Sequence, residues 1–340
     1  MGEVFAGRYE LLDPVATGGM GTIWRVLDRS DGQVKAAKIL RQSDAGSLLR
    51  FVREQSMRID HTHVVTPLSW AGVDDRVLFT MPLVRGGSVA DLLRERGPLP
   101  VRWVALLTDQ VLQALEAVHA AGIVHRDVKP GNLLLEPTGA GRPHLRLTDF
   151  GIAAPVDEPR MTRGSHAIGT PGYMPPEQWV GADPDPTADV FAVGRVALEM
   201  LIGQRPADED LKAHRTGEHA RDLLLTVVEH ATRNDPADRP ADASAMRAQL
   251  AATGLLTLPP TPGEAVVVPD RFGTAEAVTM GDLPPTTGPT HATAPLARSS
   301  TVAFGTGLAP AGRRPSALPG LLLLLAGIVG LAVATWLLVG

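Results

Sequence analysis

Apolar and polar residues alternate in three stretches near the N-terminus, and this alternation predicts three β-strands. The stretches are Tyr9–Val15, Gly21–Leu27 and Val34–Leu40. A glycine-rich turn at 18–21 connects the first two strands, and Asp31-Gly32 connects the second and third. Both connections are short and contain residues typical of hairpin turns, so we expect consecutive hairpins at the start of the fold.

Longer segments further along the chain carry apolar residues at helical spacing. Val101–Ala121 has them at positions 104, 107, 111, 112, 115 and 118, which is the spacing of one helix face. Ala188–Ile202 is apolar apart from three charged residues, which predicts a buried helix. A further helix is expected over Gly46–Ile59. Residues 1–252 therefore have the pattern of a globular domain.

The pattern stops after this region. Residues 253–317 contain ten Pro and eleven Thr, with only four acidic and four basic residues, and show no sustained period. Such a segment buries too little apolar surface to offset the entropy lost on ordering, so we expect a disordered tether.

A fully uncharged run follows the tether. Leu321–Val339 is nineteen residues long, and at ~1.5 Å per residue it nearly matches a hydrocarbon core of ~30 Å. Arg313 and Arg314 precede it and only Gly340 follows, so the positive-inside rule places the N-terminal domain in the cytoplasm. We expect a single-pass helix over 318–340 that contacts membrane lipid; a buried core helix is the alternative interpretation.

Small residues recur every fourth position within this run, at Ala326, Gly330 and Ala334. Small residues at this spacing allow two membrane helices to approach closely, which makes the run a candidate homodimer contact. Most such patterns in Ala- and Gly-rich spans carry no function.

Composition excludes several classes of function. The net charge of −5 gives no overall positive field for nucleic acid. The chain has no cysteine, which excludes disulfides, thiolate zinc sites and cysteine nucleophiles. The N-terminus has no basic region followed by an apolar run, so no secretory signal peptide is expected.

The turn between the first two strands has the composition of a phosphate-binding loop. It reads Ala16-Thr17-Gly18-Gly19-Met20-Gly21-Thr22-Ile23. Glycines lack a Cβ, so their backbone N–H groups can approach phosphate oxygens closely. Alone, this pattern is equally typical of a hairpin turn with no ligand.

Lys38 is the next candidate, on the third strand. Because side chains alternate along a strand, Lys38 faces opposite to residues 37 and 39 and points into a cleft beneath the glycine turn. A lone lysine on a strand is usually a solvated surface residue. Glu54, on the expected helix, is its candidate partner for holding the α- and β-phosphates of a nucleotide.

Residues 125–132 read His-Arg-Asp-Val-Lys-Pro-Gly-Asn, and Asp149-Phe150-Gly151 follows. Asp127 is a candidate acceptor of a hydroxyl proton, and Lys129 can neutralise the charge of a transferring group. Asn132 and Asp149 supply the hard oxygens that suit Mg²⁺. Any one Asp is more often a cap or turn residue, but this combination, with the lysine and glutamate above, indicates phosphoryl transfer.

These motifs resemble the bacterial eukaryotic-like (Hanks-type) serine/threonine protein kinases over roughly residues 8–250. Gly169–Gln178 resembles the end of their activation segment. The resemblance implies that Asp189 braces the catalytic loop and that Glu177 pairs with Arg239. It also implies an α+β, bilobal protein-kinase fold.

The implied organisation has three parts. The kinase domain spans 1–252, with a small β-rich N-lobe at about 8–81, a hinge at 82–85 and a larger helical C-lobe at about 86–252. A disordered Pro/Thr-rich linker at 253–317 and the transmembrane helix at 318–340 follow it. The kinase domain is expected on the cytoplasmic side of the cell membrane.

The resemblance implies ATP and Mg²⁺ as cofactors, and Ser or Thr of protein substrates as acceptors, since Lys129 is of the serine/threonine type. Pro82 has no N–H, but its carbonyl can accept from the adenine amino group, and Met81 is the expected gatekeeper. The implied nucleotide-binding residues are Ala16, Thr17, Gly18, Gly19, Met20, Gly21, Ile23, Ala36, Lys38, Glu54, Met81, Pro82 and Val84.

Arg126 precedes the catalytic Asp, and in this family such an arginine often binds a phosphate on the activation segment. Thr162 and Ser165 are the candidate acceptors for autophosphorylation. Thr170 corresponds to a threonine that contacts the catalytic Asp and Lys, so its first interpretation is structural and its second is a phosphosite.

Two positions and one segment depart from the family pattern. Ala16 stands where the first loop glycine is usual, and Pro175 stands where a small residue is usual. The segment between Pro206 and Asp235 is short for the family. None of these changes removes a catalytic group.

We weigh three functions against these residues. An active protein kinase is the leading hypothesis. A catalytically inactive pseudokinase scaffold is the alternative, although such proteins typically lose a residue equivalent to Lys38, Asp127 or Asp149. A small-molecule phosphotransferase is disfavoured by the complete activation segment, which forms a peptide-binding shelf.

Overall fold

The computed structural model describes residues 3–18, 21–41, 59–149, 170–183, 185–206, 211–260, 263 and 265–273. These ranges include the first 58 residues only in part, so the predicted helix over Gly46–Ile59 lies outside them except for Ile59. The predicted membrane span also lies outside, and no helix among the described residues is long and apolar enough to cross a bilayer.

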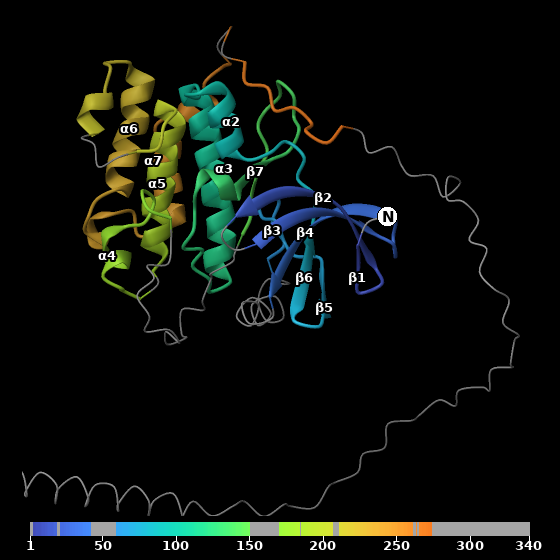
Figure 1. Cartoon of the computed structure of the whole chain (residues 1–340). Helices are drawn as coiled ribbons and strands as arrows, with labels where there is room; N and C mark the ends of the chain where they lie inside the picture. Colours follow the sequence, from blue (N-terminus) through green and yellow to red (C-terminus); the bar gives the residue numbers. More distant parts are fainter. Residues whose placement is uncertain are drawn as a thin grey trace, which may run out of the picture. The chain divides into compact units, whose positions relative to one another are not determined.

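The N-terminal part of the chain is one antiparallel sheet of six strands, in the order β1-β2-β3-β4-β6-β5 (Figure 1). The three predicted strands are present as β2, β3 and β4; β2 and β3 end later than predicted, and β4 is longer at both ends. The strands are β1 (Val4–Phe5), β2 (Tyr9–Gly18), β3 (Gly21–Asp28), β4 (Gln33–Arg41), β5 (Ser69–Val73) and β6 (Arg76–Met81).

Register assigns the two faces of this sheet. Lys38 pairs with Ile23 and with Phe79, and two residues along, Ala36 pairs with Arg25 and Met81. Paired residues, and residues two apart on one strand, share a face. Ile23, Ala36 and Lys38 therefore lie on one face, while Val26, Ala37 and Leu78 form a small buried core on the other.

Gly21 shows why the turn between β2 and β3 requires glycine. Its φ is +121°, and a Cβ at this position would lie 2.8 Å from the backbone oxygen of Ile39. Any other residue there would push β3 away from β4.

The C-terminal part is helical, with a small hairpin beside it (Figure 1). Its helices are α2 (Val89–Arg96), α3 (Val101–Ala120), α4 (Pro176–Trp179), α5 (Pro186–Ile202), α6 (His219–Ala231) and α7 (Ala243–Ala252). Short 3₁₀ turns are η2 (Pro130–Asn132), η3 (Leu211–His214), η4 (Pro236–Asp238) and η5 (Leu255–Thr257), and the hairpin is β7 (Leu133–Leu135) with β8 (Leu145–Leu147). A β-rich lobe followed by a helical lobe confirms the predicted bilobal fold.

Helix α5 forms as its sequence predicts. Asp185 caps its start by accepting from the N–H of Thr187, and Pro186 fits the first turn, where no N–H is needed. Gly203 ends it with a left-handed φ of 78°. Between these signals nearly every side chain is buried, and the helix packs against α3 and α6 in the centre of the lobe.

The chain remains packed beyond the boundary expected at Thr253. Val266 and Val268 are 0% and 1% exposed, respectively, and the backbone of Val268 pairs with Gly139. The predicted tether therefore begins too early, and residues to 273 belong to the folded domain. This segment packs as extended chain that buries Val266 and Val268 and exposes Val267, so three consecutive valines hide the alternation from the sequence. Residues 274–340 lie outside the described part.

A buried carboxylate lies at the C-terminal end of β3. Asp28 has no exposed side-chain surface and accepts from Arg8 through Nε and Nη2, both at 2.7 Å, and from Lys35 Nζ at 2.6 Å. The Arg8 guanidinium, with help from Lys35 and Ser30, holds the pKa of Asp28 well below its usual range.

We predict that Asp28→Asn lowers the free energy of unfolding by about 1.5–3 kcal/mol at pH 7, because hydrogen bonds from cations to a buried carboxylate are lost. A depressed pKa means that this stabilisation is complete above the unfolded-state pKa of about 4 and is lost as the pH falls below it. Urea unfolding should therefore show the difference shrinking below about pH 4. Asp31→Asn is the matched control, since Asp31 also contacts Lys35 but is 44% exposed, and it should cost much less than Asp28→Asn.

Candidate active site

The loop that follows α3 is held by one carboxylate from α5. Asp189 Oδ2 accepts from the N–H of His125 at 2.8 Å, and its Oδ1 accepts from the N–H of Arg126 at 2.8 Å. His119 of α3 contacts Oδ2 through Nε2 at 2.8 Å. The side chain of Asp189 is completely buried. Burial alone would raise its pKa, but the His119 contact and the backbone donor outweigh burial and hold the pKa low.

This brace holds the loop in an unusual backbone conformation. Arg126 has a φ of 65°, which costs a residue with a Cβ roughly 1–2 kcal/mol. The conformation turns two consecutive N–H groups toward one carboxylate, and so directs the next residue, Asp127, away from the core.

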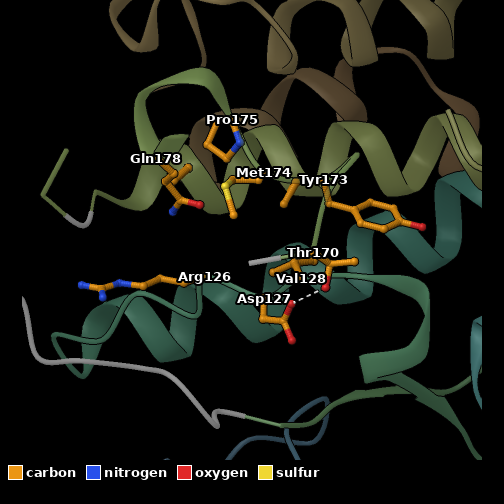
Figure 2. Close-up of a pocket in the computed structure, with 10 residues that line it drawn as sticks. Arg126, Asp127, Val128, Thr170, Tyr173, Met174, Pro175 and Gln178 are labelled. Atoms are coloured by element: carbon orange, nitrogen blue, oxygen red, sulfur yellow. Dashed lines mark hydrogen bonds between the residues drawn. The ribbon is translucent and has the colours of Figure 1, made fainter. Parts of the chain in front are cut away.

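The carboxylate of Asp127 is fixed by three side chains. Oδ1 accepts from Thr170 Oγ1 at 2.9 Å, and Oδ2 accepts from Lys129 Nζ at 2.6 Å and Asn132 Nδ2 at 3.0 Å. Lys129 Nζ also donates to Thr170 Oγ1 at 3.1 Å. The hydroxyl of Thr170 thus donates to Asp127 and accepts from Lys129, which agrees with the expected structural role of Thr170. Figure 2 shows the Asp127–Thr170 contact as a dashed line.

A pocket lies directly over this carboxylate (Figure 2). One side is the loop itself, and the other is the segment that ends the predicted activation segment. Its lining is Arg126, Asp127, Val128, Thr170, Tyr173, Met174, Pro175, Gln178, Ala188 and Ala192. Asp127 forms an acidic floor, and polar and apolar side chains share the walls.

The wall opposite Asp127 is anchored to the helical core. Arg239 donates to both oxygens of Glu177, at 2.7 and 2.8 Å, and its guanidinium lies 4.9 Å from the ring centre of Phe191. Tyr173 donates to Glu199 of α5, and burial raises the pKa of both groups. The start of α4 therefore has a fixed position relative to the catalytic loop.

On the N-lobe side, Lys38 contacts Asp149. Nζ lies 2.5 Å from Oδ1, and the lysine side chain is only 6% exposed. Asp149 also has a left-handed φ of 65°. The predicted partner of Lys38 is Glu54. Glu54 lies outside the described residues, so this pairing stays a prediction. The direct Lys38–Asp149 contact was missed, because residues 111 positions apart leave no local signal.

Asn132 and Asp149 together fit a hard divalent cation. The amide nitrogen of Asn132 donates to the backbone oxygen of Asp127 at 2.8 Å as well as to its carboxylate, which leaves the amide oxygen to act as a ligand. Two protein oxygens suit Mg²⁺, which keeps several waters and binds substrate phosphates. Elsewhere in the described ranges, no group of three or more His, Asp or Glu side chains forms a metal site.

The remaining predicted residues are distributed over the cleft. Ile23 and Ala36 lie on the Lys38 face of the sheet, and Met81 ends β6, with Pro82 and Val84 following in the hinge. Ala16, Thr17 and Gly18 end β2, and Gly21 begins β3. Gly19, Met20, Glu54, Thr162 and Ser165 lie outside the described residues, so the phosphate-binding role of Arg126 is not tested.

The sequence pattern does not predict the roles of three residues that support the site. His119 contacts Asp189, Glu199 contacts Tyr173, and Arg195 donates to the backbone oxygens of Gly172 and Pro206. Their only signal was polarity within an apolar helical pattern. Such polarity indicates a buried contact without saying what is contacted.

Comparison with known proteins gives consistent results. The family model described as protein kinase domain matches residues 9–258. Serine/threonine-protein kinase PkaA of Streptomyces coelicolor is 35% identical, over 85% of this chain and 61% of the relative. PknA of Mycobacterium tuberculosis is 34% identical, over 71% and 55%, and PkaB of S. coelicolor is 40% identical, over 61% and 51%. The chain thus spans about half to three-fifths of the length of these curated relatives.

We predict that Asp189→Asn releases the start of the catalytic loop. An asparagine places an NH₂ group against one of the two backbone donors, so at least one bond is lost, and a loss of about 1.5–3 kcal/mol speeds local opening roughly tenfold or more. Hydrogen–deuterium exchange should show this acceleration at the amides of His125 and Arg126. Asp183→Asn, an exposed neighbour before α5, should leave both amides unchanged. Unaltered exchange in Asp189→Asn would contradict the brace.

Proposed function

This chain belongs to the protein kinase family, and we propose that it transfers the γ-phosphoryl group of ATP to serine or threonine hydroxyls of proteins. The arrangement of Asp127 carries this proposal. Its carboxylate is held by Thr170, Lys129 and Asn132 at the floor of a pocket whose opposite wall begins α4. A substrate chain on that wall would present its hydroxyl to the carboxylate.

In the proposed reaction Asp127 orients the substrate hydroxyl and takes its proton. The hydroxyl oxygen forms a bond to the γ-phosphorus while the bond from phosphorus to the ADP oxygen breaks. Lys129 is 2.6 Å from Asp127, so its ammonium lies where charge develops on the transferring group and stabilises it. Thr170 keeps the carboxylate in the orientation that this transfer needs.

Lys38 and the hinge position the nucleotide in this proposal. The Lys38 ammonium would hold the α- and β-phosphates, with Glu54 as its partner, and the β2–β3 turn would cover them. The backbone at Pro82 and Val84 would hold the adenine, below Ala36 and Ile23. Asn132 and Asp149 would hold Mg²⁺, which when bound neutralises phosphate charge.

Autophosphorylation is part of the same proposal. Arg126 lines the pocket beside Asp127, and an arginine there can bind a phosphate carried by Thr162 or Ser165. Phosphate on either residue would order the activation segment. The inactive-scaffold alternative gains no support, because Lys38, Asp127 and Asp149 are all present in one site.

We also propose that the kinase domain is held at the cytoplasmic face of the cell membrane by the apolar run Leu321–Val339. The length and lack of charge of this run support the proposal, and pairing through its small-residue face would bring two kinase domains together.

The activity is tested with full-length protein, Mg²⁺ and labelled ATP. We predict that Asp127→Asn loses at least about 100-fold in phosphate transfer, the scale of a lost general base, and that chelating Mg²⁺ abolishes transfer. Thr170→Ser, which keeps the hydroxyl, should retain most of the activity. Equal labelling of wild type and Asp127→Asn would overturn the proposal.

If phosphosite mapping of active protein finds Thr162 and Ser165 both unmodified, the activation-segment proposal fails.

The membrane proposal has its own measurement. Full-length protein should remain with membranes after a carbonate wash, because a spanning helix is not released by high pH. A chain ending at Ala317 is the control and should be washed off. Release of both proteins alike would show that the run does not span the membrane.

A further inference from the structure

The chain continues past the kinase family match, which ends at residue 258. Residues 265–273, which we call the C-terminal strap, return along the C-lobe as extended chain. Val268 exchanges two backbone hydrogen bonds with Gly139, at 2.8 and 3.0 Å, and Arg96 donates to the backbone oxygen of Ala265 at 2.9 Å. Figure 1 shows the strap in orange, passing the β7–β8 connection toward the N-lobe sheet.

The strap is bound to the backbone directly after the hinge. Arg271 donates its N–H to the backbone oxygen of Arg85 at 2.9 Å and its Nε to that of Gly86 at 3.0 Å. Its guanidinium also binds both oxygens of Glu95 on α2, each at 2.8 Å. An ion pair of 2.9 Å joins Arg85 to Asp270. These contacts fix the course of the strap beside the hinge.

Two glycines make room for this contact. A Cβ on Gly86 would lie 2.4 Å from the backbone oxygen of Leu135 and 2.6 Å from Val268 Cγ1, and a Cβ on Gly87 would lie 2.3 Å from Arg271 Nε. Gly87 also has a φ of +82°, which favours glycine. The backbone after the hinge is therefore shaped to accept the strap.

Beyond the hinge, the strap reaches the N-lobe. The guanidinium of Arg25 on β3 lies 5.2 Å from the ring centre of Phe272, within the range of a cation–π contact. Arg25 is itself held by Asp13 on β2, at 2.6 Å. The strap is thus attached to both lobes.

Strand register shows where Phe272 meets the sheet. Arg25 is two residues from Ile23, the partner of Lys38, so Arg25 shares the face that contains Lys38. That face is the cleft face, because Lys38 contacts Asp149 of the other lobe. Arg25 pairs with Ala36, and Ala36 pairs with Met81, the last residue before the hinge. Through Arg25, Phe272 therefore contacts the face of the sheet that contains Lys38, on a row of paired residues that leads to Met81.

We infer that Phe272, held in place by Arg271, forms the outer wall of the nucleotide site and positions ATP. The inference rests on the proposed ATP-dependent function. The ring closes the hinge-side mouth of the cleft with a flat apolar surface suited to a purine or ribose, and it links the lobes through Arg25. The nucleotide site then includes residues from beyond the family domain.

The test uses full-length protein and two measurements, the Kd of a fluorescent ATP analogue and the split between kcat and the KM for ATP. We expect Phe272→Ala and Arg271→Ala to raise Kd and KM about 3- to 10-fold, with kcat changed less than about twofold, since both residues act on binding. Phe272→Tyr keeps the ring and should restore wild-type values. Val267→Ala is the matched control, because Val267 lies on the same strap and is 55% exposed.

Each outcome decides the inference. Unchanged Kd in both alanine variants, with wild type binding ATP, overturns the strap's role and leaves the proposed function intact. A wild-type protein that neither binds ATP nor transfers phosphate overturns both. If the alanine variants unfold at a lower temperature without nucleotide, and their kcat falls while Kd and the KM for ATP keep wild-type values, the strap is only structural and the inference is wrong.

Discussion

The active site depends on the hydrogen bonds that the buried carboxylate of Asp189 accepts. This carboxylate accepts from two consecutive backbone N–H groups, those of His125 and Arg126, and so holds Arg126 at a φ of 65°. That conformation costs roughly 1–2 kcal/mol, whereas each hydrogen bond to a charged group contributes about 1.5–3 kcal/mol. The two hydrogen bonds therefore outweigh the cost of the Arg126 conformation, and Asp127 lines the pocket.

The same helix organises the wall of the pocket opposite Asp127. Besides Asp189, α5 contributes Phe191 to the guanidinium of Arg239, Arg195 to the backbone of Gly172, and Glu199 to Tyr173. The catalytic loop and the wall opposite it are thus fixed against one buried element. A hydroxyl placed on that wall would meet Asp127 without movement of the core, which is the preorganisation that proton transfer requires.

The two lobes are joined inside the cleft and at its mouth. Inside, Lys38 of the sheet contacts Asp149, which follows β8. At the mouth, the strap is held by Arg271 on the C-lobe and meets Arg25 of β3 through Phe272. Both contacts lie on the same face of the sheet, so each bears on the space assigned to the nucleotide.

The amino-acid sequence by itself determined the strands β2–β4, the helices α3 and α5, and the identities of the residues around Asp127. When a strand or a helix buries one face, its apolar residues recur every two or every 3.6 residues. Helix α5 is buried on nearly all sides, and in the sequence it is an apolar run between a capping Asp and a Gly. The motif residues are close together along the chain, so their spacing alone places them on one loop.

Only the tertiary structure decided which distant side chains meet. The contact of Lys38 with Asp149, the braces from His119 and Glu199, and the strap at 265–273 join elements tens to more than a hundred residues apart. The local pattern of apolar and polar residues indicates that a residue is buried, but the partner of that residue depends on how the helices and the sheet pack. The strap shows this most clearly, because its buried and exposed positions at 266–268 are all valines, so only the surface that it covers decides which of them are buried.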